Sequence, residues 1–196
     1  MYLWRGSAVF SGVTQMRRHV AVLFADISGF TRLVESAEPE AVYRTVRPLM
    51  DALVSRVHGY GGEIQQILGD GFMSVFGLHA QDGDEADRAV RAALALVRTG
   101  PGEPAVHAGV EYGEVLVTPS WEPAGYGVWG RTVTVAKRLC EVAGPGTVSV
   151  GPAAFARSTV LARPAPPVPV RLKGISRVIL AHRLSVGADR PLALAS

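Results

Sequence analysis

The sequence predicts an α+β fold in which helices cover one mostly antiparallel β-sheet. Segments with apolar residues at helical spacing are interspersed with short apolar runs that are typical of strands. Two pairs of these runs follow one another directly, as the strands of hairpins do. The resulting order is strand, helix, helix, hairpin, helix, hairpin, helix and strands, which differs from the regular alternation of a doubly wound parallel sheet.

The first third of the chain contains a strand and two helices. A continuous apolar run predicts the first strand at 19–25, and the segment 27–31 leads into a short helix. Glu38 and Pro39 mark the start of a second helix, because proline is favoured in the first helical turn. The apolar stripe of that helix consists of Val42, Val46, Leu49, Leu53 and Val57. The glycines of 59–62 end it.

The middle of the chain contains two hairpins around a helix. Runs 63–68 and 72–77 flank the turn Gly-Asp-Gly, which predicts the first hairpin. Acidic residues at 82–87 favour a helix start. The apolar face of the helix that follows consists of Ala86, Ala89, Val90, Ala93, Leu94 and Val97. Runs 105–111 and 114–118 predict the second hairpin.

The last third begins with an expected exposed excursion at 119–130. A helix is predicted at 132–142, and the Gly-Pro-Gly sequence after it ends that helix. Strands at 147–150 and 177–184 complete the sheet, with a loop at 164–169 between them.

Length and composition indicate a single globular domain. The chain has 196 residues, of which 48% are hydrophobic and 19% charged, so it can bury a core and is not disordered. We expect a leader at 1–18, the folded domain at 19–187 and a mobile tail at 188–196.

Several classes of function are disfavoured by the composition. No apolar run approaches the about 20 residues of a membrane span, and the N-terminus lacks the order of a signal peptide. Cys140 is the single cysteine, which fits a reducing compartment, and we expect a cytoplasmic protein. The net charge of +3 is scattered without interleaved aromatic residues, so we expect no nucleic-acid partner. A weakly positive field suits a small polyanionic substrate.

Two aspartates stand where predicted strands end. Asp26 follows the first strand and Asp70 lies in the turn of the first hairpin. Each alone would most simply cap a helix or form a turn. Together they favour a shared hard cation bound with phosphate oxygens, because a carboxylate at the end of a buried strand is costly without a partner. Backbone N–H groups at 27–31 would favour the phosphate.

Three segments carry a resemblance to a known family. They are 24–31 (FADISGFT), 68–77 (LGDGFMSVFG) and 126–139 (YGVWGRTVTVAKRL), and they occur in this order. The chain from His19 to Leu184 resembles the catalytic domain of class III nucleotidyl cyclases, the adenylyl and guanylyl cyclase superfamily. The resemblance implies a ferredoxin-like α/β sandwich, a head-to-tail homodimer and a nucleoside triphosphate substrate. It also implies two Mg²⁺ or Mn²⁺ ions per site and release of pyrophosphate as the cyclic nucleotide forms.

The resemblance assigns roles to one half of the site. Asp26 and Asp70 would hold the two metal ions, and Ile27 would add a backbone carbonyl. The substrate phosphates would contact Ser28, Gly29, Phe30 and Thr31. This chemistry is an in-line phosphoryl transfer, in which positioning and charge neutralisation dominate.

The partner subunit would supply the other half. Arg138 falls on the arginine that neutralises charge at the α-phosphate, and Lys173 falls on a lysine that contacts the terminal phosphates. Thr134 replaces the asparagine that orients the ribose.

The positions that read the base depart from the family pattern. Gln66 stands where adenylyl cyclases have lysine, and Gly127 stands where they have aspartate or threonine. Glutamine can donate and accept, so it does not select a base by charge, and Gly127 removes a side chain. Trp129 lies near the expected pocket, where it could narrow the pocket or read the base, or pack in the dimer.

Three interpretations therefore remain open. The first is a pyrimidine cyclase that makes cyclic UMP or cyclic CMP, similar to those of antiphage signalling, with a downstream effector that binds the product. The second is an adenylyl cyclase with non-standard base-reading residues. The third is a catalytically inactive module that binds nucleotide or only dimerises. Retention of Asp26, Asp70, Arg138 and Lys173 argues against the third.

Overall fold

The computed structural model describes residues 15–100, 102–119, 126–160 and 166–185. Its strands are β1 (Met16–Ile27), β2 (Glu63–Leu68), β3 (Gly71–Phe76), β4 (Val106–Pro119), β5 (Tyr126–Trp129), β6 (Thr147–Val150), β7 (Val168–Val170) and β8 (Ile179–Ser185). Its helices are α1 (Phe30–Ser36), α2 (Pro39–Gly59), α3 (Glu85–Leu96), α4 (Arg131–Val142) and α5 (Pro152–Phe155).

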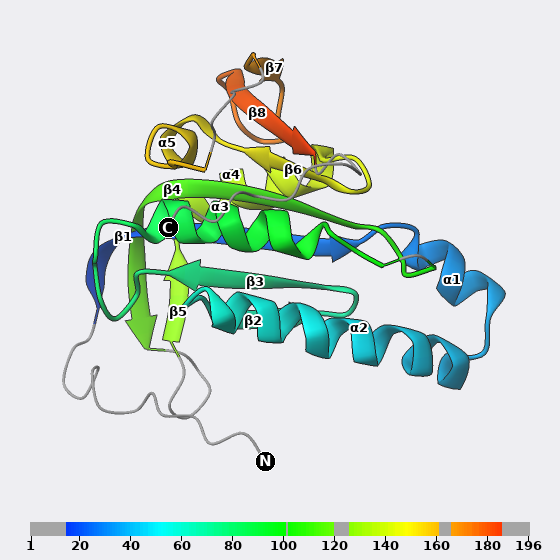
Figure 1. Cartoon of the computed structure of the whole chain (residues 1–196). Helices are drawn as coiled ribbons and strands as arrows, with labels where there is room; N and C mark the ends of the chain where they lie inside the picture. Colours follow the sequence, from blue (N-terminus) through cyan, green and yellow to red (C-terminus); the bar gives the residue numbers. More distant parts are fainter. Residues whose placement is uncertain (1–14, 101, 120–125, 161–165, 186–196) are drawn as a thin grey trace, which may run out of the picture.

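The strands form one eight-stranded sheet. The order is β2-β3-β1-β4-β6-β8-β7, and β5 pairs with β4 outside this path (Figure 1). β1 pairs antiparallel with both β3 and β4, whereas β4 and β6 run parallel. The predicted α+β fold with a mostly antiparallel sheet is therefore confirmed. Among the described residues, no helix is long and apolar enough to cross a membrane.

The alternation of side chains along β1 divides the core into two layers. Leu23, Ala25 and their neighbours at odd positions face α2 and α3, in a core cluster that those helices share. Val22 and Phe24 face the opposite side, where α4 packs. Asp26 continues this second series, so the alternation places its side chain on the α4 face of the sheet.

Five elements differ from the sequence predictions. β1 begins at Met16 rather than at 19, because it pairs with β4 from its first residue onward. The hairpin expected at 105–118 is one continuous strand, β4, whose central residues keep their register with β1. Residues 126–129, expected in an exposed excursion, form β5 against β4. β7 and α5 were not predicted, because three and four residues give too short a pattern. The expected leader up to residue 14 and the tail at 188–196 lie outside the described residues.

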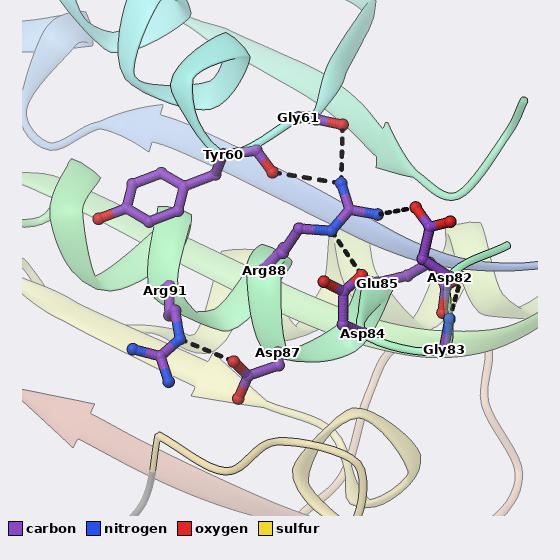
Figure 2. Close-up of polar contacts among 9 residues, drawn as sticks. All are labelled: Tyr60, Gly61, Asp82, Gly83, Asp84, Glu85, Asp87, Arg88 and Arg91. Carbon is purple, nitrogen blue, oxygen red and sulfur yellow. Dashed lines mark hydrogen bonds and ion pairs between the residues drawn. The ribbon is translucent and has the colours of Figure 1, made fainter. Parts of the chain in front are cut away.

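A network of charged side chains ties α3 to its neighbours (Figure 2). Arg88 donates from Nη1 to the carbonyl oxygens of Tyr60 and Gly61, at 3.3 and 3.2 Å, and from Nε to Asp84 Oδ1 at 2.7 Å. The end of α2 is thereby joined to the start of α3. Asp87, the residue before Arg88, accepts from Arg91 Nε at 2.7 Å and from the Thr159 amide at 2.6 Å. Asp87 therefore fixes the segment that follows α5 to α3.

Close contact between β4 and α4 leads to a prediction about Gly109. A Cβ atom at Gly109 would lie 2.2 Å from the Cys140 amide nitrogen and 2.4 Å from the Ala136 carbonyl oxygen, so α4 would have to move. Gly109→Ala should lower the free energy of unfolding by about 1–3 kcal/mol. Urea denaturation measures this. Gly59→Ala, at the end of α2 with no atom near its added Cβ, is the control and should be neutral or slightly stabilising. Equal midpoints for the two variants would contradict the close packing of α4.

A second prediction concerns the acid sensitivity of the Asp87 contacts. Burial alone would raise the pKa of Asp87, but the hydrogen bonds from Arg91 and Thr159 outweigh it and lower the pKa. A lowered folded-state pKa means that the carboxylate stabilises the fold above its ordinary pKa and loses this effect as the pH falls. Asp87→Asn should therefore lower the free energy of unfolding by about 1–2 kcal/mol near neutral pH, and by much less near about pH 3. Urea titrations at both pH values test this, and a constant difference would refute it.

Candidate active site

Asp26 and Asp70 meet at one end of the sheet. Asp26 lies in β1 opposite Gly71 of β3, which directly follows Asp70 in the turn. The Ile27 amide donates to the Asp70 carbonyl oxygen at 3.2 Å, which fixes the turn against the strand end. A Cβ atom at Gly71 would lie 2.7 Å from Asp26 Oδ1, so glycine is required where the Asp26 carboxylate lies. The structure thus brings together two carboxylates that are 44 positions apart in the sequence.

The two carboxylates repel one another. The pKa of Asp70 is raised, first by partial burial and then by the negative charge of Asp26. His107 Nε2 lies 3.8 Å from Asp26 Oδ2, but burial lowers the pKa of His107 despite the opposing effect of Asp26. A neutral imidazole provides no positive charge. Among the described residues, the ion pairs of the two aspartates include no lysine or arginine, so a bound cation would relieve the repulsion.

The donor set fits a hard divalent cation. Asp26 and Asp70 offer carboxylate oxygens, and Ile27, the residue after Asp26, offers a backbone carbonyl oxygen. Within the described ranges, no three His, Cys, Asp or Glu side chains gather as a complete metal cluster. Mg²⁺ is commonly held by one or two carboxylates together with substrate phosphates and water, rather than by an all-protein cage. The residues present therefore fit such an ion when a phosphate ligand shares it.

The segment after β1 offers fewer free amides than the sequence suggested. The Ser28 amide donates to the Ala105 carbonyl oxygen at 2.8 Å, and Ser28 Oγ lies 2.9 Å from His107 Nδ1. Gly29 adopts the left-handed conformation with φ of 80°, which turns the chain into α1. The amides of Gly29, Phe30 and Thr31 come at the start of that helix, before intrahelical bonding begins. Among the predicted phosphate contacts, these three amides are therefore better placed than the Ser28 amide to bind a phosphate.

The residues predicted to come from the partner subunit lie elsewhere on the chain. Thr134 is exposed on α4, and Arg138 lies one turn further along. Arg138 Nη1 donates to both carboxylate oxygens of Glu141, at 2.7 and 2.6 Å. Its Nε atom is buried and has no hydrogen-bond partner among the described residues. Arg138 is therefore held in place on α4 by Glu141, while its buried Nε donor is unused among the described residues.

Thr134 lines a pocket that adjoins the turn of Lys173. Lys173 is exposed in a turn between β7 and β8. A pocket of about 640 Å³ adjoins this turn, and its lining consists of Arg131, Thr134, Gly174, Ile175, Ser176 and Arg177. Arg177 is a lining residue that the sequence analysis does not identify. The signal that could have indicated it is its position shortly after Lys173. The pocket combines two guanidinium groups with the Thr134 hydroxyl, which suits an anionic ligand.

We call Asp26, Ile27 and Asp70 the proposed metal-binding half of the site, and Thr134, Arg138 and Lys173 its α4 half. Among the described residues, no hydrogen bond or ion pair joins Asp26 or Asp70 to Thr134, Arg138 or Lys173.

The predicted base-reading positions lie on β2 and β5. Gln66 is exposed and stands opposite Met73, which itself pairs with Phe24, so Gln66 shares the sheet face of Asp26. On β5, Trp129 Nε1 donates to Thr118 Oγ1 at 3.1 Å.

Trp129 explains why position 127 carries no side chain. A Cβ atom at Gly127 would lie 2.6 Å from Trp129 Nε1 and 3.0 Å from Thr118 Oγ1. The indole of Trp129 thus takes the space that a side chain at position 127 would need, while 54% of Trp129 remains exposed.

Comparisons with known proteins agree with this architecture. The family model for the adenylate and guanylate cyclase catalytic domain matches residues 13–170. A Streptomyces coelicolor protein named adenylate cyclase is 30% identical over 178 residues, which cover 85% of this chain and 43% of that protein. An uncharacterized Mycobacterium tuberculosis protein is 34% identical over 131 residues, covering 64% of this chain. The chain matches only 24% of that relative's length, so the curated relatives are considerably longer.

Solved structures share the fold. The adenylyl cyclase CyaB from P. aeruginosa superposes with a TM-score of 0.79 at 22% identity, covering 91% of this chain and all of that one. The guanylyl cyclase Cya2 gives a TM-score of 0.80 at 24% identity, covering 93% of this chain and 99% of that one. At these identities the likeness establishes the fold alone, whereas the family match extends over most of the sequence. With its carboxylate pair at the end of β1, this chain belongs to the family of adenylyl and guanylyl cyclase catalytic domains.

Proposed function

We propose that this domain converts a nucleoside triphosphate into a 3′,5′-cyclic nucleotide and pyrophosphate, at sites shared between two copies of the chain. The observation that carries the proposal is the pair of carboxylates, Asp26 and Asp70, held together without a lysine or arginine ion-pair partner among the described residues. A structural pair would be more stable with a basic partner, so the arrangement favours a site that binds a cation together with substrate.

In this proposal Asp26, Asp70 and the Ile27 carbonyl hold two Mg²⁺ or Mn²⁺ ions. When bound, these ions would neutralise phosphate charge and favour ionisation of the attacking 3′-hydroxyl. The amides of Gly29–Thr31 bind phosphate oxygens at the start of α1. These groups hold the triphosphate so that the 3′-oxygen attacks the α-phosphorus in line with the departing pyrophosphate.

The partner subunit completes the site. Arg138 of the partner subunit neutralises the charge that develops on the α-phosphate, while Lys173 of the partner subunit contacts the terminal phosphates. Thr134 of the partner subunit approaches the ribose. Among the described residues, no hydrogen bond or ion pair links these residues to Asp26 or Asp70 within one chain, and a homodimer would bring the two sets together across its interface.

We further propose that the preferred base is a pyrimidine, so that UTP gives cyclic UMP or CTP gives cyclic CMP. Gln66 carries no charge, and the Trp129 indole occupies the space beside Gly127. A base site bounded by this indole would fit a single ring better than a purine. A cyclic pyrimidine nucleotide would serve as a second messenger in antiviral defence, in the cytoplasm, with an effector that binds it.

ATP is the second candidate substrate. The Streptomyces relative that covers 85% of this chain is named adenylate cyclase, which favours cyclic AMP as the product. Gln66 can present both a donor and an acceptor, which the adenine edge also requires.

The first functional prediction concerns turnover. With Mn²⁺, the purified protein should release pyrophosphate and form a cyclic nucleotide from at least one of ATP, GTP, CTP and UTP, with the highest kcat/KM for UTP or CTP. Liquid chromatography with mass spectrometry identifies the product. Asp26→Asn and Asp70→Asn should each lower the rate by roughly 100-fold or more, because each removes a ligand charge from the metals.

Asp51→Asn is the matched control for these variants. Asp51 is exposed on α2 and pairs with Arg47, remote from the proposed ligands, so its loss should leave the rate unchanged. Absence of turnover with all four nucleotides would refute the cyclase proposal, and a clear preference for ATP would refute the pyrimidine preference.

The second functional prediction concerns the shared site. Asp26→Ala and Arg138→Ala should each be nearly inactive alone, because each damages a different half of the site. Mixing the two proteins should restore activity, since a mixed dimer contains one site with both halves intact. Up to about a quarter of the wild-type rate is expected if subunits exchange freely. A mixture as inactive as its components, in dimers shown by mass spectrometry to have exchanged, would place both residues in one subunit's site.

A further inference from the structure

A hydrogen-bonded group of four side chains connects β2 with β5. Tyr126, the first residue of β5, donates from its hydroxyl to Glu63 Oε2 at 2.9 Å and accepts from Gln65 Nε2 at 2.6 Å. His79 Nε2 lies 2.8 Å from the same Glu63 oxygen. We refer to Glu63, Gln65, His79 and Tyr126 as the β2–β5 network. None of its members belongs to the metal-binding half or to the α4 half of the site.

The network is partly buried and geometrically fixed. The side chains of His79 and Glu63 are 30% and 32% exposed. The rings of His79 and Tyr126 meet edge to face, with centroids 6.0 Å apart and an interplanar angle of 88°. Burial, and then the negative charge of Glu63, raise the pKa of Tyr126 above its ordinary value. The Tyr126 hydroxyl therefore remains protonated and serves at once as donor to Glu63 and acceptor from Gln65.

An irregularity in β2 allows Gln65 to reach Tyr126. The register between β2 and β3 shifts between Ile64 and Gln66, so Gln65 is an extra residue in the strand. Gln66 returns to the ladder opposite Met73. The irregularity thus separates the roles of two adjacent glutamines. Gln65 anchors the strand through Tyr126, while Gln66 stays exposed.

The contacts lie directly beside both positions that are expected to read the base. Gln65 precedes Gln66, and Tyr126 precedes Gly127, so the 2.6 Å hydrogen bond joins the two backbones one residue away from each position. We propose that the β2–β5 network sets the spacing between positions 66 and 127, which makes Tyr126 and Gln65 positioning residues for nucleotide selectivity. This inference rests on the proposed function, because it assumes that a nucleotide base lies between these positions.

Selectivity is the property that this spacing would control. Discrimination between bases depends on polar groups that match one base edge and are left unpaired by another. If β2 and β5 can shift relative to each other, Gln66 can adjust to several bases, and the penalty for a wrong base falls. Loosening the network should therefore reduce the differences in affinity among the four nucleotides, while binding of their common triphosphate group is weakened less.

Tyr126→Phe tests this inference, because it removes the hydroxyl and keeps the ring. The affinities of the four 3′-deoxynucleoside triphosphates would be measured by calorimetry with Mn²⁺, since these compounds lack the attacking hydroxyl and cannot be cyclised. In the wild type one base should be preferred. In Tyr126→Phe the ratio of the preferred to the least preferred affinity should fall about tenfold, the size expected from losing one or two hydrogen bonds. Tyr112→Phe, which removes a hydroxyl from β4 outside the network, should keep the wild-type ratio.

A double-mutant cycle separates positioning from general destabilisation. Gln65→Leu should flatten the preference in the same way, and adding it to Tyr126→Phe should produce little further change, because both remove the same hydrogen bond. Affinity for inorganic triphosphate, which has no base, should be the same in all variants. The proposal would be overturned by a wild-type affinity ratio in Tyr126→Phe, by additive effects in the cycle, or by a loss of affinity for inorganic triphosphate as large as the loss for the nucleotides.

The outcomes also distinguish this proposal from the proposed function. The variants could lower the affinity ratio in a protein that never forms a cyclic nucleotide. That result would support the network as a determinant of selectivity and reject the cyclase activity. Turnover by the wild type, with an unchanged affinity ratio in the variants, would support the cyclase activity and reject the role of the network. Failure of every nucleotide to bind would reject both.

Discussion

β1 is hydrogen-bonded along both of its edges, to β3 and to β4, and the rest of this domain depends on this constraint. β1 pairs along its length with β4 and along its second half with β3, so it cannot slip or turn without breaking two ladders. Its alternation then assigns each neighbouring side chain to the layer of α2 and α3 or to the layer of α4. Because Asp26 is the last residue but one of this strand, its carboxylate has a fixed face and a fixed position beside the turn that carries Asp70.

The same constraint explains why close backbone approaches occur where glycine stands. Gly71 leaves room for the Asp26 carboxylate, and Gly109 allows α4 to lie directly on β4. α4 in turn carries Thr134 and Arg138, so the position of the proposed partner half of the site follows from how closely this helix packs. A nucleotide site that is divided between subunits needs both halves to be rigid, since neither has a ligand to organise it before the dimer and substrate come together.

The contacts of β5 separate the proposed base-reading positions from the carboxylate pair. Trp129 fills the space beside Gly127 and bonds to Thr118, while Tyr126 joins β5 to β2. These contacts lie at the end of β4 remote from Asp26, which pairs with His107 near the start of that strand. Residues proposed to determine the base can thus vary while the carboxylate pair stays unchanged, which would account for a chain that keeps Asp26 and Asp70 and has unusual residues at positions 66 and 127.

The sequence by itself determined the fold class and most of the helices, and it singled out Asp26 and Asp70 as candidate metal ligands, because apolar periodicity and residues at strand ends are local signals. It did not determine that 105–118 is one strand, since Gly113 resembles a turn residue until Thr132 of α4 is seen to lie against it. It did not separate Gln65 from Gln66, because the irregularity that assigns them different roles exists only in the pairing with β3. Tertiary structure also decided that the Ser28 amide is already bonded and that Trp129 covers Gly127. Contacts between residues far apart in the chain depend on register and packing, which no local pattern encodes.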